Sequence, residues 1–284
     1  MTRVLLSLGH GYSAQALAAR LRPQGWRIIG TTRSAEKAER LRAQGVEPLI
    51  WPGDDLGPAL AQADAVLLSI APDAAGDPVF NAHAAQVAAA RPGWIGYLST
   101  TGVYGDHGGG WVDEDTPLTP GTRRGEQRVL AERQWQGLAA AHDLPLHIFR
   151  LAGIYGPGRG PFSKVRDGTA RRIIKPDQIF SRIHVEDIAL VLDASIQRPD
   201  PGAIYNVCDD DPTPPEDVLA HAADLLGLPI PPAIPIDEAE MNPMQRSFYA
   251  ESKRVRNERL ARDLGVKLRY PSYREGLAAL LAGA

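Results

Sequence analysis

The residues of this chain best suited to chemistry begin with a glycine-rich turn, Gly9-His10-Gly11-Tyr12-Ser13-Ala14. A largely apolar run over residues 4–8 precedes the turn, and a helix-forming stretch over residues 15–21 follows it. Gly9 permits a tight turn, Gly11 leaves the backbone open to a pyrophosphate, and Ala14 is small enough for helix–strand packing. The helix N-terminus offers free N–H groups and partial positive charge to that anion. The pattern predicts a dinucleotide site, the alternative being an ordinary strand–helix turn.

The end of the second predicted strand, residues 26–32, carries no carboxylate. In NAD-specific sites an acid at this point binds the ribose 2′-hydroxyl, whereas here the residues are Thr32, Arg33 and Ser34. A planar guanidinium suits a phosphate, so Arg33 favours NADP(H), with NAD(H) as the alternative cofactor. Arg33 would otherwise be a solvated residue at a helix start.

Further cofactor contacts are expected where other strands end, because ligands of parallel sheets bind beyond the carboxyl ends of the strands. The third, fourth, fifth and sixth predicted strands cover residues 47–51, 65–70, 94–99 and 146–151. The residues expected to contact the cofactor there are Asp55 and Leu56, near the adenine, and Ser69, Ile70, Ala71, Ser99, Leu151 and Gly153.

Strands alternate with predicted helices over residues 34–43, 78–90 and 122–141, and a seventh strand is expected at 203–207. This alternation predicts an α/β fold with a doubly wound parallel sheet and right-handed crossovers. We expect residues 1–152, joined by 183–208, to form a dinucleotide-binding domain. Residues 153–182 and 209–284 would form a small C-terminal substrate lobe, and the crevice between the two would be the substrate site.

Composition excludes several classes of function. The chain has 284 residues, a formal net charge of −3 and one cysteine, Cys208. This charge gives no general attraction to nucleic acid or an anionic membrane. One cysteine excludes an internal disulfide, and no cluster of His, Cys, Asp or Glu has metal-ligand spacing, so no metal is expected. The absence of a signal peptide or transmembrane run favours a cytoplasmic protein, and we expect Cys208 to be buried and inert.

Five motifs together resemble the extended branch of the short-chain dehydrogenase/reductase superfamily, the epimerase/dehydratase-like enzymes. They are the glycine turn, STTGVYG at 99–105, RLAGIYGPGR at 150–159, RIHVEDIA at 182–189 and YNV at 205–207. The resemblance implies a Rossmann fold, a nicotinamide dinucleotide and a small-molecule substrate. Dimers through a helix pair are common in that family, so a homodimer is one expectation, although no helix here marks an interface. The reaction is less defined, because one fold supports many chemistries.

The resemblance also implies a catalytic set, namely a Ser/Thr after the fifth strand and a Tyr-x-x-x-Lys on the next helix. Thr100 matches the first position. Counting back from Ala131-Glu132, the tyrosine position falls on Arg124 and the lysine position on Arg128. A guanidinium has a pKa above about 12, so Arg124 cannot replace a tyrosine as acid and base, whereas Arg128 suits a ribose or phosphate. We therefore assign Thr100 and Arg128 to the catalytic site and expect a non-standard proton donor.

Tyr104, four residues after Thr100, is the first replacement to consider. It could serve if a nearby arginine lowered its pKa. The alternative is that Tyr104 packs the loop. The other candidate donors are His107, Glu126, Tyr155 and His184.

Cations in the predicted lobe favour an anionic substrate such as a phosphate, nucleotide or carboxylate, unless they only form solvated helix faces. They are Arg159, Lys164, Arg166, Arg171, Arg172, Lys175, Arg182, Arg246, Lys253 and Arg254.

Two functions stay open. The first is an NADP(H)-dependent oxidoreductase or epimerase/dehydratase-like enzyme for a small polar, anionic or sugar-nucleotide-like substrate. The second, favoured by the missing tyrosine, is an NADP(H)-binding sensor with little or no turnover.

Overall fold

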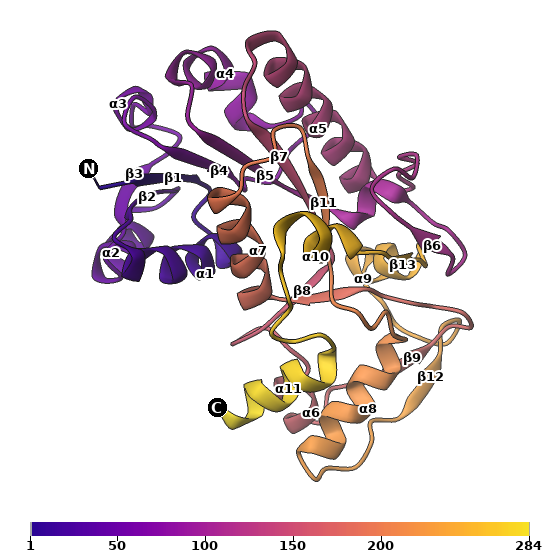
Figure 1. Ribbon diagram of the computed structural model, residues 1–284. Coiled ribbons are helices and arrows are strands. Elements are labelled where there is room, and N and C mark those ends of the chain that lie inside the picture. Colours follow the sequence, from indigo (N-terminus) through magenta and orange to yellow (C-terminus); the bar gives the residue numbers. More distant parts are fainter. Residues whose placement is uncertain (1, 284) are drawn as a thin grey trace.

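The centre of the molecule is a seven-stranded parallel sheet. The computed structural model describes residues 2–283 and gives the strand order β11-β7-β5-β4-β1-β2-β3 (Figure 1). The strands are β1 (Val4–Leu8), β2 (Arg27–Thr32), β3 (Glu47–Ile50), β4 (Ala65–Leu68), β5 (Trp94–Thr100), β7 (Leu146–Leu151) and β11 (Ile204–Val207). The order runs outward from β1 in both directions, which confirms the predicted doubly wound sheet. The predicted bounds of β1 and β7 are confirmed, and the ends of the other strands differ from the predicted ones by at most two residues.

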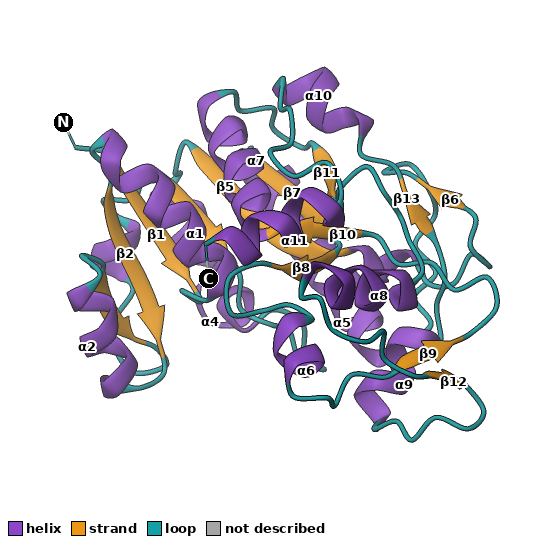
Figure 2. Cartoon of the chain, turned by 90° about the horizontal axis from the view of Figure 1, so that it is seen from below, coloured by secondary structure: helices purple, strands orange, loops and turns teal. Residues whose placement is uncertain are grey.

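Helices cover both faces of this sheet (Figures 1 and 2). One face carries α1 (Tyr12–Leu21), α2 (Ala35–Ala43) and α7 (Val185–Gln197), and the other carries α3 (Gly57–Leu60), α4 (Pro78–Ala90) and α5 (Arg123–His142). Both faces of strand β1 are covered by helices because both carry apolar side chains. Leu5 packs into the apolar cluster that contains Leu17 and Val191, whereas Leu6 packs into the cluster that contains Trp135. Successive side chains of a strand point to opposite faces, so these strands are apolar almost throughout.

A smaller unit lies at the bottom of Figure 1 and is built from two separate parts of the chain. Its elements are β8 (Gly153–Tyr155), α6 (Phe162–Arg166), β9 (Arg172–Ile174), β10 (Arg182–His184), α8 (Pro215–Leu225), β12 (Ala233–Pro235), α9 (Pro243–Tyr249) and α11 (Tyr273–Ala282). A third apolar cluster, which includes Tyr155, Val165, Ala222 and Leu277, forms its core. Between the two parts the chain returns to the main sheet, where α7 packs on α1 and β11 pairs with β7.

Short elements connect the two units and position the site. The 3-10 turn η2 (Thr101–Tyr104) follows β5, and β6 (Trp111–Val112) pairs with β13 (Arg254–Val255) more than a hundred residues later. The Thr122 hydroxyl accepts a hydrogen bond from the Gly125 N–H at 3.1 Å and so caps α5. The remaining elements are η1 (Arg22–Gln24) and α10 (Glu258–Leu264).

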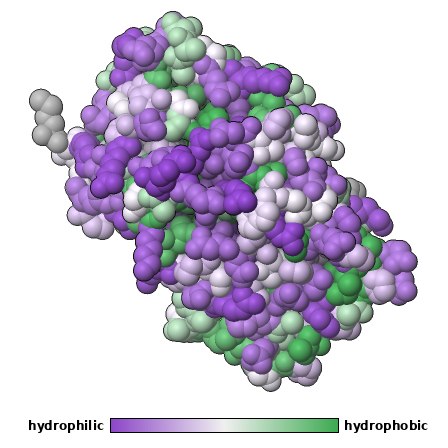
Figure 3. Space-filling view, turned by 45° about the vertical axis from the view of Figure 1, so that its right-hand side comes forward, coloured by the Kyte–Doolittle hydropathy of each residue, from purple (hydrophilic) through white to green (hydrophobic). Residues whose placement is uncertain are grey.

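The surface of the protein is largely polar on the face shown in Figure 3. The large apolar side chains that are exposed include Trp111, Ile230 and Phe248. Among residues 2–283, none of the helices combines the length and apolar character needed to cross a membrane.

Candidate functional site

A cleft of about 700 Å³ lies at the carboxyl ends of β1, β4, β5 and β7. Its walls come from the glycine turn, the loop after β5, the first turns of α5, strand β8 and the segments 179–182 and 247–253. This volume is within the range of about 300–1,000 Å³ that is typical of small-molecule sites. The cleft therefore joins the predicted dinucleotide end to the smaller unit.

The glycine turn has the geometry that its sequence predicts. Gly9 has a φ of +90°, and a Cβ there would lie 2.9 Å from the backbone nitrogen of Ile70, so only glycine fits without strain. The Gly9 N–H donates to the Thr31 hydroxyl at 2.7 Å, which ties the turn to β2. A Cβ on Gly11 would have its nearest neighbour, the Gly9 carbonyl oxygen, 3.7 Å away, so the backbone is open on that side. The turn thus offers the approach that a pyrophosphate needs.

The structure brings most of the predicted cofactor and catalytic residues together in this cleft. Those that line it are Gly9, Gly11, Tyr12, Ser13, Ala14, Ser69, Ala71, Ser99, Thr100, Arg128, Leu151 and Gly153. The Ser69 hydroxyl also donates to the Gly9 carbonyl at 2.5 Å and so steadies the turn.

Other predicted residues lie outside the lining. The Leu56 side chain is fully buried in the core, Ile70 packs beneath Gly9, and the Asp55 carboxylate accepts from the Gly57 N–H at 2.8 Å at the start of α3. These contacts are structural, so the adenine contact expected of the Asp55–Leu56 turn stays a prediction. Thr32 is also buried.

The adenosine end of the predicted site carries positive charge and an unpaired imidazole. Arg33 is exposed just after β2, and the Ser34 hydroxyl caps α2 by accepting from the Lys37 N–H at 3.3 Å. His10 is buried against Gly30, and neither of its ring nitrogens has a hydrogen bond partner among the described residues. Burial and the nearby Lys37 lower the pKa of His10 to about 4. The open face of Gly11 leaves room for a dinucleotide at this end of the cleft.

Thr100 and Arg128, the predicted catalytic residues, both line the cleft. Thr100 ends β5, and its hydroxyl accepts from the Gly102 N–H at 3.2 Å while the residue also lines the cleft. Arg128 donates from Nη1 to the Leu98 carbonyl at 2.6 Å and to the Tyr97 hydroxyl at 3.1 Å. The guanidinium is thereby held at the cleft wall. Arg124, the residue that the resemblance aligns with the family's tyrosine, also lines the cleft.

The prediction that Tyr104 acts as a proton donor with a lowered pKa is wrong. Its side chain is fully buried and does not line the cleft. Its hydroxyl donates to Asn206 Oδ1 at 2.7 Å and accepts from Arg150 Nη1 at 2.9 Å. Burial raises the pKa of Tyr104 to about 12, because desolvation outweighs the lowering effect of Arg150. Tyr104 packs and anchors the loop instead.

This anchor is part of a buried polar network that joins several of the motif residues. Arg150 and Glu132 form an ion pair at 2.9 Å that is almost completely buried, and the Ser99 hydroxyl donates to the same carboxylate. A buried pair of this kind stabilises the fold only as long as both partners and their hydrogen bonds are present. The network therefore fixes β5, α5, β7 and β11 relative to one another behind the cleft.

Three of the four other candidate proton donors have structural partners, and the fourth, Glu126, lies outside the cleft lining. The His184 Nδ1 accepts from the Glu186 N–H at 3.2 Å and so caps α7. The His107 ring lies 3.1 Å from the Tyr104 carbonyl, and Glu126 is not in the cleft lining. Tyr155 does line the cleft, but burial raises its pKa and its hydroxyl donates to the Ser272 carbonyl at 3.4 Å.

Sequence reasoning missed the contribution of residues 247–253, which come from the far end of the chain. Lys253 reaches the loop after β5, where its ammonium donates to the Gly105 carbonyl at 2.7 Å and to Glu251 at 2.8 Å. Both side chains are nearly buried, and Glu251 Oε1 has no partner among the described residues. The sequence marks Lys253 as one of the lobe's cations, but nothing in its spacing indicates a place beside Gly105.

The cleft has a strongly positive lining. It contains Arg124, Arg128, Arg159, Arg182 and Lys253, against the single carboxylate of Glu251. The Arg182 Nη1 donates to the Phe180 and Thr213 carbonyls at 2.9 and 3.0 Å, and burial lowers its pKa. Of the ten cations predicted to bind an anion, only three, Arg159, Arg182 and Lys253, belong to this lining.

Comparison with known proteins gives a family match and a curated relative. Residues 6–208 match the NAD dependent epimerase/dehydratase family. Protein YeeZ of Escherichia coli K12 is 34% identical over 221 residues, which is 71% of this chain and 76% of that protein.

Two solved structures extend the comparison. A functionally unknown conserved protein from Silicibacter pomeroyi is 60% identical and has a TM-score of 0.93 over 99% of both chains. MoeE5, solved in complex with UDP-glucose and NAD, is 20% identical and has a TM-score of 0.77 over 99% of this chain and 97% of its own. At that identity the likeness concerns the fold.

Proposed function

The chain belongs to the NAD-dependent epimerase/dehydratase family, and from this premise we propose that it is an NADP(H)-preferring oxidoreductase or epimerase/dehydratase-like enzyme for a small anionic substrate. The observation that carries the proposal is a single cleft that joins the glycine turn to Thr100, Arg128 and a cationic wall. The nicotinamide, when bound, supplies hydride chemistry. Residues 9–14 would hold the pyrophosphate, and Arg128 the ribose next to the nicotinamide.

The preference for NADP(H) rests on Arg33 and on the absence of an acid at the end of β2. A guanidinium there, with Lys37 one helical turn further on, suits a 2′-phosphate. We expect affinity for NADP(H) to exceed affinity for NAD(H), and Arg33→Ala to remove most of that difference, about tenfold or more for a lost charge-assisted contact. Isothermal titration with both cofactors measures this directly. A wild type that binds NAD(H) more tightly would contradict the proposed preference.

The substrate class follows from the charge of the wall. Five cations and one carboxylate give the cleft an excess of positive charge, which favours phosphate- or carboxylate-bearing molecules. MoeE5, which shares the fold, binds a nucleotide sugar, and sugar nucleotides are therefore the first compounds to test. Arg182 and Arg159, on the lobe side, would bind the anionic part of the substrate, while Thr100 would donate a hydrogen bond to the reacting oxygen.

The proton for that oxygen needs a source other than Tyr104. Lys253 is the lining residue that fits, because two of the three N–H groups of its ammonium are bonded and one is left for a substrate oxygen. Lys253 would give this proton to the carbonyl oxygen of the substrate during its reduction, which would leave a neutral amine for solvent to reprotonate. Lys253→Arg keeps the charge but cannot give up a proton, so kcat should fall far more than KM rises.

The test of the enzyme proposal uses NADPH with a panel of carbonyl compounds and sugar nucleotides, followed at the nicotinamide absorbance band. Turnover should be lost in Thr100→Val and Lys253→Arg. The matched control is Lys175→Arg, because the Lys175 ammonium also donates to a backbone carbonyl, that of Tyr249, outside the cleft lining. A Lys253→Arg variant with wild-type kcat would contradict the assignment of the proton donor.

One observation favours a second function. Arg124 occupies the family's tyrosine position, and an enzyme that has lost its acid/base can persist as a dinucleotide-binding sensor. This alternative predicts tight NADP(H) binding with no turnover across the whole panel. Binding together with Thr100-dependent turnover would exclude it.

A further inference from the structure

A tight turn of the smaller unit, residues 156–159, contacts the start of α1. The Tyr12 hydroxyl donates to the Pro157 carbonyl at 3.0 Å. Two backbone hydrogen bonds of 2.9 Å between Gly156 and Arg159 close the turn. A Cβ on Gly156 would lie 2.5 Å from the Tyr12 hydroxyl, so a glycine is needed for this close approach. The 156–159 turn is therefore held against the glycine-turn end of the cleft.

Arg159 places its guanidinium over the Tyr12 ring. Its Cζ lies 5.8 Å from the ring centroid, and both residues line the cleft. Among residues 2–283, no carboxylate forms an ion pair with this guanidinium. Glu186, which lies within electrostatic reach of Tyr12, is paired with Arg269 at 2.7 Å. An arginine without a carboxylate partner can bind an anion that enters the cleft.

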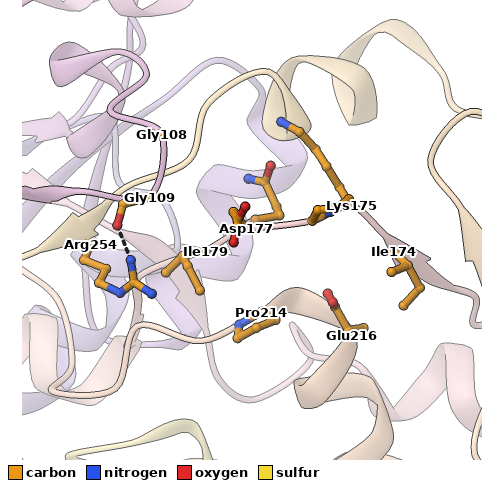
Figure 4. A pocket seen from close by; sticks show the side chains of 11 residues that line it. Gly108, Gly109, Ile174, Lys175, Asp177, Ile179, Pro214, Glu216 and Arg254 are labelled. Atoms are coloured by element: carbon orange, nitrogen blue, oxygen red, sulfur yellow. Dashed lines mark hydrogen bonds between the residues drawn. The ribbon is translucent and has the colours of Figure 1, made fainter.

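Two neighbouring cations differ from Arg159 because backbone carbonyls hold them. Arg254 and Lys175 line a second cavity, of about 310 Å³ (Figure 4). The Arg254 Nη1 donates to the Gly109 carbonyl, and the Lys175 ammonium donates to the Tyr249 carbonyl. In the part of the chain that the structure describes, the Arg159 side chain makes no such bond, and the residue is exposed. The N–H groups of Arg159 are thus open to a ligand of the cleft.

The helix end beside this guanidinium suits an anion. Tyr12 is the first residue of α1, next to the open face of Gly11, and the first turn of this helix contains no acidic residue. The N–H groups at a helix start and their partial positive charge favour a phosphate. Arg159 adds a full positive charge at the same end of the cleft.

We propose that Arg159 is a cofactor-binding residue whose guanidinium pairs with the pyrophosphate of the dinucleotide, in addition to the substrate role proposed for it. The inference rests on the proposed function, since it needs a dinucleotide in the glycine turn. NAD(H) and NADP(H) share the pyrophosphate, so the contact serves both cofactors, whereas Arg33 acts on the 2′-phosphate of NADP(H) alone. The smaller unit thus takes part in binding the cofactor.

Isothermal titration with NADPH, NADH and ADP-ribose, without substrate, tests this contact. ADP-ribose keeps the pyrophosphate and lacks the nicotinamide. Arg159→Gln should weaken the binding of all three ligands about tenfold, as expected for one charge-assisted hydrogen bond, and Arg159→Lys should restore part of that affinity. Arg33→Ala should weaken NADPH alone. The matched control is Arg166→Gln, because the Arg166 guanidinium also lies 5.8 Å from an aromatic ring, that of Phe162, but outside the cleft lining.

The outcomes separate this contact from the proposed function. A wild type that binds none of the three ligands would overturn both. If the wild type binds them, unchanged affinity in Arg159→Gln would overturn the contact alone, even if the substrate KM rises, because Arg159 would then serve only the substrate. A loss confined to NADPH, unchanged binding of ADP-ribose, or an equal loss in Arg166→Gln would overturn it as well. Equal melting temperatures of the variants and the wild type show that the variants are folded.

Discussion

The hydroxyl of Tyr104 should be a stabilising group rather than a catalytic one, and Tyr104→Phe tests this. The substitution keeps the aromatic ring and removes only the bonds to Asn206 Oδ1 and from Arg150 Nη1. Arg150 retains its ion pair with Glu132, so most of the cost comes from the unpaired oxygen of Asn206. A buried acceptor left unpaired costs about 1–3 kcal/mol, and we expect a loss of about 2 kcal/mol in the free energy of unfolding.

Equilibrium unfolding in urea measures this loss, with NADP(H) titration on the same samples. The matched control is Tyr12→Phe, whose hydroxyl donates to the Pro157 carbonyl at 3.0 Å in an exposed position. Its effect on the free energy of unfolding should stay within about 0.5 kcal/mol. The reasoning is refuted if Tyr104→Phe is as stable as the wild type but no longer binds NADP(H) or turns over substrate.

Three further predictions concern packing and titration. Gly276→Ala would place a Cβ 2.1 Å from the Tyr155 hydroxyl and should destabilise the protein by about 1–3 kcal/mol. The control, Gly137→Ala, meets nothing within 4 Å and should stabilise the protein by up to about 1 kcal/mol. Equal effects of the two substitutions on thermal unfolding would contradict this prediction. Burial raises the pKa of Asp209 to about 8 from 3.8, so the folded state holds a proton that the unfolded state has lost, and the free energy of unfolding should fall as pH rises from about 4 to 8. Asp209→Asn should flatten that fall in urea titrations at pH 5 and pH 8, and an unchanged slope would count against the assignment. Cys208 is buried, its pKa is raised by burial and its thiol donates to the Val255 carbonyl. The thiol should therefore react with a disulfide reagent only after denaturation. Rapid labelling of the native protein would contradict this prediction.

The main sheet and the glycine turn could be predicted from the sequence because their signals are local. Apolar runs such as residues 65–68 and the Gly9–Ala14 turn lie within single strands or strand–helix joints. Thr100 and Arg128 could be assigned by resemblance, since the family order fixes their register.

The surroundings of Tyr104 could not be predicted in the same way. Its partners, Arg150 and Asn206, are 46 and 102 residues away along the chain, and burial rather than charge decides its pKa. The place of Lys253 was missed for a similar reason, because the pairing of β13 with β6 brings it to Gly105 from 148 residues away. No periodicity in the sequence specifies such a pairing.

The threading of the chain through both units has a consequence for how the protein is made. When a ribosome has released only residues 1–152, strand β7 is an open edge and the Tyr104 hydroxyl lacks its acceptor, Asn206. Strand β11 closes that edge later, and Lys253 joins the cleft later still. Domains usually fold as units during synthesis, but here neither unit is finished before the other has begun. A nascent chain therefore exposes a sheet edge that chaperones or aggregation partners can pair with, and it acquires a complete cleft only after Lys253 has been released.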